Sequence, residues 1–144
     1  MPEKQTLERA REDAREGKSP STQAGEFVRE EFHHVREGKH GARSPQQAIA
    51  IGLSKARRAG VKLGAPEGSA SLRKKAAQDS AAGKEHRETS RTRSRAVSGA
   101  LKREPKASAS RRAISKQAKK SAAKRGPRAR RAAAVKAAHT RKAA

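Results

Sequence analysis

Large apolar side chains are scarce in this chain, and their scarcity limits what it can fold into more than any other feature. Only fifteen of the 144 residues are Val, Ile, Leu or Phe, and the sequence contains no Trp, Tyr or Cys. That share lies below the roughly 20% at which chains tend to lose a packed core. Burying so little apolar surface offsets the conformational entropy of only a short ordered stretch. We therefore expect extensive disorder rather than a globular domain of the full length.

Residues 19–64 carry the pattern that can form a core. Ser19 and Pro20 are typical of an N-cap followed by the first residue of a helix, and Gly38 is typical of a helix end. Between them apolar residues recur at helical spacing, namely Ala24, Phe27, Val28, Phe32 and Val35. This spacing predicts one amphipathic helix.

A second helix is predicted to follow. Ser44 and Gln47 form a capping-box pattern, in which each side chain accepts a hydrogen bond from the backbone of the other. Gly60 is expected to end this helix, with Val61 closing back on Ala56.

The connector 38–43 is short, so we expect the two helices to form an antiparallel hairpin over about residues 19–60. Gly52 should allow close approach of the two backbones. The hairpin buries about eight large side chains, which barely offsets its ordering entropy. We therefore expect it to need a partner or a second copy of itself.

Charge is distributed unevenly along the chain. The first 40 residues contain eight Lys and Arg against nine Asp and Glu, whereas the remaining 104 carry a net charge of +24. Residues 105–144 contain fourteen Lys and Arg and no acidic residue. Such a run cannot neutralise itself, so we expect it to stay largely extended until a polyanion neutralises it.

These patterns predict a mostly α-helical chain with extensive disorder, in four parts. A charged N-terminal helix within residues 1–18 precedes the hairpin of residues 19–64. Residues 65–104 are expected to be a linker with weak helices. Residues 105–144 are expected to be a basic, low-complexity and partly helical tail, divided at Gly126.

The tail is the main candidate for binding nucleic acid, because phosphate contacts need cations and little else. Its candidate residues are Arg111, Arg112, Lys116, Lys119, Lys120, Lys124, Arg125, Arg128, Arg130, Arg131, Lys136, Arg141 and Lys142. A second candidate patch lies at the end of the second helix and consists of Lys55, Arg57, Arg58 and Lys62. Cations at a helix C-terminus also interact favourably with the helix dipole, so a purely structural role is an equal alternative for this patch.

Metal binding and catalysis are not expected. His33 and His34 lie in helical register with Glu30 and Glu31, and His40 follows in the connector. A two-helix metal site would need matching ligands on the second helix, which has no Asp, Glu or His. We expect no metal and no cofactor. Catalytic groups need rigid support that so small a core does not provide, so we also expect no enzyme and no small-molecule substrate.

Other function classes are also disfavoured. No apolar run approaches the roughly 18 residues that span a membrane, and the N-terminus does not resemble a secretory signal, so we expect an intracellular protein without a membrane role. The connector is longer than the three to four residues of a helix-turn-helix, which argues against sequence-specific DNA readout. The lack of exposed aromatic residues argues against stacking of single-stranded bases.

A motif in the hairpin resembles a known family. Lys39-His40-Gly41, followed by Ser44-x-x-Gln47 and the run from Ala48 to Gly60, is similar to a family of small, basic bacterial proteins often described as DNA-binding. The tail resembles, in composition, the Lys/Ala-rich arms of linker-histone-like nucleoid proteins. The resemblance implies a bacterial cytoplasmic setting, at the nucleoid, and contact with nucleic acid.

The leading expectation is therefore a non-enzymatic, histone-like protein that coats or compacts DNA through phosphate contacts of its tail, with DNA favoured over RNA. Self-association through the hairpin would tether several tails to one duplex. The alternative is an adaptor whose hairpin binds a partner protein while the tail tethers it to RNA, the ribosome or another polyanion.

Overall fold

The computed structural model describes residues 1–143 and contains six α-helices and one short 3-10 helix in that range. The helices are α1 (Lys4–Arg15), α2 (Pro20–Glu37), α3 (Pro45–Arg58), α4 (Ala70–Lys84), α5 (Arg91–Lys102) and α6 (Arg111–Ala143), with the 3-10 helix η1 (Ala107–Ala109) before α6. The chain forms two compact units, Met1–Ala109 and Ser110–Ala144. The prediction of a mostly α-helical chain is confirmed. The expected extensive disorder is not what the structure shows, because helices cover most of residues 70–143.

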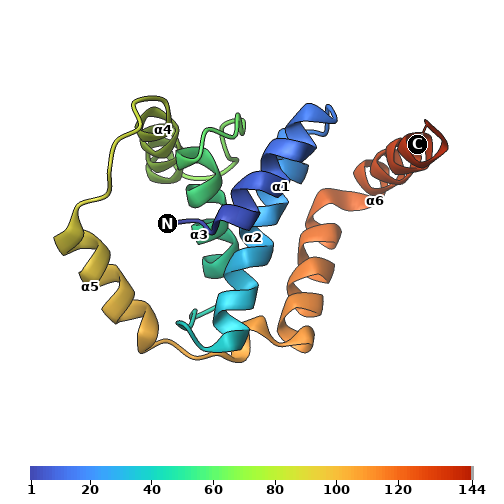
Figure 1. Ribbon diagram of the computed structural model, residues 1–144. Helices are drawn as coiled ribbons and strands as arrows, with labels where there is room; N and C mark the ends of the chain where they lie inside the picture. The colour runs from blue at the N-terminus through green and yellow to red at the C-terminus, as the bar shows by residue number, and fades with distance from the viewer. Residues whose placement is uncertain (144) are drawn as a thin grey trace. The chain divides into compact units, whose positions relative to one another are not determined.

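The hairpin is formed by α2 and α3, which run antiparallel and side by side (Figure 1). Ser19 caps α2 by accepting a hydrogen bond from the backbone N–H of Thr22, and Gly38 ends it in the left-handed region with a φ of 78°. The two backbones meet at Gly52, where an added Cβ would lie 2.7 Å from the Cα of Val28. The predicted close approach is confirmed.

Local hydrogen bonds set both ends of α3. The Ser44 side chain accepts from the N–H of Gln47, but the Gln47 side chain accepts from the N–H of Arg43 rather than that of Ser44. The reciprocal half of the predicted capping box is thus displaced by one residue. At the other end the N–H of Val61 donates to the carbonyl of Ala56 at 3.0 Å, as predicted for a Schellman ending.

The core of the first unit is built mainly from small side chains. One cluster contains Ala10, Ala24, Phe27 and Ala56, and a second contains Val35, Ala42, Ala48 and Ala109. Alanine and glycine let the helices approach closely, so dispersion contacts are made without large side chains. This packing explains how a chain with few large apolar residues forms a unit of 109 residues.

The N-terminal helix α1 packs against α2. Thr6 and Ala10 are buried, and Leu7 packs against the first cluster. Gly17 ends the helix with a φ of 72°. Hydrogen bonds from Lys18 to Asp13 and Glu16 raise the pKa of the Lys18 ammonium. The helix therefore belongs to the folded unit.

Residues 65–104 are not only a linker, because α4 is part of the folded unit. Ala76, Asp79, Ala82 and Gly83 are buried. The side chain of Asp79 accepts a hydrogen bond from Ser54 of α3 at 2.8 Å. An added Cβ at Gly83 would overlap the Arg57 carbonyl, so the backbones of α3 and α4 touch.

The end of α5 and the segment after it contact the connector between α2 and α3. The N–H of Gly41 donates to the Leu101 carbonyl at 2.8 Å, and the N–H of Ala42 donates to the Pro105 carbonyl at 3.0 Å. The Arg36 guanidinium donates to the Ala109 carbonyl at 3.1 Å. Residues 105–109 thus belong to the first unit, and the basic unit begins at Ser110 rather than at the expected residue 105.

Candidate nucleic-acid interface

The second unit consists of α6 and carries the densest positive charge of the chain. Thirteen Lys and Arg lie within the helix, and it contains no Asp or Glu. None of its described residues is buried. The cations therefore have no carboxylate side chain within their unit to pair with.

A break at Gly126 divides α6 into two halves. Gly126 has a φ of 76° and a ψ of 168°, which lies outside the helical region, and Pro127 follows it. Pro127 is well placed as the first residue of a helix, since it needs no donor there. Ser110 caps the first half by accepting from the N–H of Ala113 at 3.2 Å. The predicted division at Gly126 is confirmed.

The cations are spread around both halves rather than along one face. With 3.6 residues per turn, Arg111, Arg112, Lys120 and Arg125 lie at about 0°, 100°, 180° and 320° around the axis of the first half. Such a distribution does not form a flat patch for one protein partner. It suits a ligand with many negative charges, such as a phosphate backbone.

Most residues of the second predicted patch pair with other groups of the first unit. Lys55 pairs with Glu31 at 2.7 Å and with Glu30 at 3.3 Å. Arg57 is 8% exposed and donates to the Gly64 carbonyl at 3.1 Å.

The other two members of that patch differ from each other. The Arg58 guanidinium lies 3.7 Å from Asp79 and donates to the hydroxyl of Thr89 at 3.2 Å. Lys62 is exposed. Three of the four residues thus stabilise the fold of the first unit, and Lys62 alone among them faces solvent.

A buried cluster of charged side chains was not predicted. Glu30 and Glu31 of α2 are 5% and 1% exposed, and both pair with Lys55 of α3. Glu31 also contacts His40 at 2.8 Å. The sequence did contain a signal, because Glu31 lies four residues after Phe27 and four before Val35, on the apolar face of the helix.

The N-terminus extends this cluster. The Glu3 carboxylate lies 2.9 Å from both His34 Nε2 and Lys39 Nζ. Hydrogen bonds from His34 and then Lys39 lower the pKa of the Glu3 carboxyl to about 2. Hydrogen bonds to Glu3 and Glu37 raise the pKa of Lys39.

Comparisons with protein-family models, curated proteins and solved structures find no match. Among the helices of residues 1–143, none is long and apolar enough to cross a membrane.

Proposed function

We propose that this protein binds duplex DNA without enzymatic activity and largely without sequence preference, through phosphate contacts of α6. The observation that supports this function is the exposed helical unit with thirteen cations and no acidic residue. Each cation that meets a phosphate releases condensed counterions, which drives binding entropically. Contacts of this kind position a protein on DNA but read no base sequence.

The helix α6 contains no Phe, Tyr or Trp, which supports duplex over single-stranded ligands. The two Phe residues of the chain lie in the first unit, where Phe27 is 1% exposed and Phe32 is half-buried. Single-stranded recognition relies on aromatic platforms. The resemblance of residues 39–60 to basic bacterial proteins is consistent with a DNA-coating role at the bacterial nucleoid.

The test is the salt dependence of binding to duplex DNA and to duplex RNA of equal length. With six to ten phosphate contacts, affinity should fall by about 10³–10⁵ between 50 and 200 mM salt. Weak salt dependence would contradict the proposal. Equal affinity for both duplexes would mean that the ligand is duplex nucleic acid in general and not DNA in particular.

A matched pair of variants locates the contacts. One variant changes Lys119, Lys120, Lys124 and Arg125 of α6 to Gln, and the control changes the exposed Lys4, Arg73, Lys74 and Lys84 of the first unit to Gln. Both lose four positive charges. The α6 variant should make the negative slope of log affinity against log salt shallower by about three to four, and the control should leave the slope nearly unchanged. Equal effects would mean that net charge, rather than α6, drives binding.

The adaptor alternative has weaker support. The apolar hollow on the first unit has a volume of about 140 Å³ and is lined by residues such as Leu7, Ala10, Phe27 and Val61. A space of that size accepts about one side chain, whereas a groove for a partner helix needs several anchor positions.

A further inference from the structure

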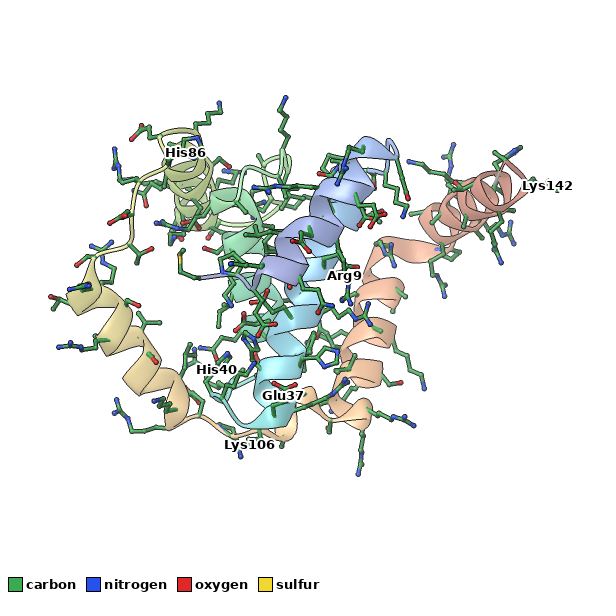
Figure 2. All side chains as sticks on the ribbon, viewed as in Figure 1. Arg9, Glu37, His40, His86, Lys106 and Lys142 are labelled. Carbon is green, nitrogen blue, oxygen red and sulfur yellow. The ribbon has the colours of Figure 1, made fainter. Side chains whose placement is uncertain are left out.

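Three potential metal ligands meet where α2 ends and the connector begins. Glu31 and His34 share one face of α2, and the turn at Gly38 brings His40 back toward them. One ligand atom from each of Glu31, His34 and His40 lies within 4.8 Å of the other two. Figure 2 shows His40 beside the C-terminal half of α2. A site between two helices would take its third ligand from α3, whereas here the third ligand comes from the connector.

Both ring nitrogens of His40 lie beside oxygen atoms. Its Nδ1 lies 2.9 Å from the Gly41 carbonyl, which can only accept, so Nδ1 carries a hydrogen. Its Nε2 lies 2.8 Å from Oε1 of Glu31, and an ionised carboxylate also only accepts. A neutral His40 would therefore direct a lone pair at a carboxylate oxygen. A proton or a metal ion removes this repulsion.

The charge balance of the cluster points the same way. Glu3, Glu30, Glu31 and Glu37 supply four negative charges, and Lys39 and Lys55 supply two positive charges. With neutral imidazoles the cluster is therefore net negative, and its two buried carboxylates, Glu30 and Glu31, share the one ammonium of Lys55. Excess negative charge around buried carboxylates is costly, so the cluster favours an additional cation.

The three ligand side chains already have contact partners of the kind that orient metal ligands in proteins. Ligating imidazoles usually donate their second N–H to a carbonyl or carboxylate, as His40 does to Gly41. Oε2 of Glu31 lies 2.7 Å from Lys55 Nζ, which leaves Oε1 directed at His40. His34 is held by Glu3 at 2.9 Å.

We propose that Glu31, His34 and His40 bind a divalent transition metal of the Zn²⁺ class, with water completing the coordination. Two imidazoles and one carboxylate suit Zn²⁺, whereas Mg²⁺ and Ca²⁺ prefer oxygen ligands alone. Ligands on one tetrahedral Zn²⁺ lie roughly 3.3 Å apart, so the 2.8 Å contact between His40 and Glu31 would open by about half an ångström, and the ligand atom of His34, now within 4.8 Å of both, would close in. A cavity of about 240 Å³, lined in part by Glu3, Glu30, His34 and Lys39, gives access from the His34 side. The metal would hold the connector on α2, and this inference does not depend on DNA binding.

The test is a Zn²⁺ titration of the full chain after treatment with a chelator, followed by calorimetry and thermal unfolding. We expect one saturable Zn²⁺ per chain, a higher melting temperature with Zn²⁺, and no such effect of Mg²⁺. The variants His34→Gln and His40→Gln should bind Zn²⁺ at least about tenfold more weakly. His33→Gln is the matched control, because His33 is exposed on the same helix and lies outside the cluster. It should bind like the unmodified chain.

A spectroscopic measurement on the unmodified chain keeps the proposal testable if a variant unfolds. Co²⁺ bound to imidazole and carboxylate ligands should give the visible absorption of a four- or five-coordinate site, and Zn²⁺ should displace it at one equivalent. A chain that binds no Zn²⁺ saturably, or that binds it equally well with His40 changed, would overturn the proposal.

Discussion

At the residue scale, several close backbone contacts in this protein require glycine, because a Cβ atom would not fit there. Gly52, Gly41 and Gly83 each lie where a Cβ would collide with the backbone of another segment. Each is therefore required by tertiary packing rather than by an unusual local conformation, since none of the three has a positive φ. The sequence predicted a close approach at Gly52, but gave no such signal for Gly41 or Gly83.

Two alanine substitutions within the hairpin should have opposite effects. Gly52→Ala places a Cβ 2.7 Å from Val28 Cα, which should cost about 1–3 kcal/mol of unfolding free energy. Gly25→Ala meets nothing within 4 Å and should stabilise the helix by about 0.5–1 kcal/mol. Urea unfolding measures both. Equal effects would mean that α2 and α3 do not pack at Gly52.

The buried ion pairs of Lys55 give a second prediction at this scale. Lys55→Met leaves Glu30 and Glu31 without their shared partner and should destabilise the first unit by about 3–5 kcal/mol. Lys62→Met removes an exposed cation and should change stability by less than about 0.5 kcal/mol. Thermal unfolding distinguishes the two. Similar small losses would show that Lys55 is a surface cation, as its sequence context suggested.

At the element scale, α2 and α6 are stabilised in different ways. The α2 helix buries Phe27 and Val35 and is covered by its neighbours, whereas none of the described residues of α6 is buried. Helicity in α6 therefore depends on the high propensity of alanine. It is opposed by like charges four residues apart, such as Lys116 with Lys120 and Lys120 with Lys124, at about 0.2–0.5 kcal/mol per pair.

Neutralising phosphates should therefore increase the helicity of α6. Circular dichroism should show a gain at 222 nm when duplex DNA is added to the full chain. The α6 variant with four Gln should start with more helix and gain less, because its repulsion is already reduced. A constant signal would indicate that repulsion among these cations does not limit the helix.

At the scale of the whole molecule, the first unit completes its own core. The hairpin alone was expected to need a partner, but α1, α4 and residues 101–109 contact α2, α3 or their connector. Both core clusters lie within Met1–Ala109. The folded core and the proposed polyanion-binding surface thus lie in different units of the chain.

Removal of the second unit should therefore leave folding intact. A chain of residues 1–110 should unfold cooperatively, with a melting temperature within a few degrees of the full chain, and should sediment as a monomer. It should also lose most of its affinity for duplex DNA. Loss of cooperative unfolding would show that α6 contributes to the core, and a stable dimer would restore the expectation that the hairpin self-associates.

The sequence by itself determined where the helices of the hairpin begin and end, because those signals act within a few residues. Ser19, Gly38, Ser44 and Gly60 lie where predicted, and the hydrogen bonds that each needs come from its own neighbours. The division of the basic tail at Gly126 followed from equally local chemistry.

Only the tertiary structure decided which charged residues remain available. Lys55, Arg57 and Arg58 look like a basic patch along the sequence, but carboxylates and carbonyls from other segments pair with them. Likewise His40 meets Glu31 only because the chain reverses at Gly38. The physical reason is that a cap depends on adjacent residues, whereas a charge pair depends on distant residues that the fold brings together.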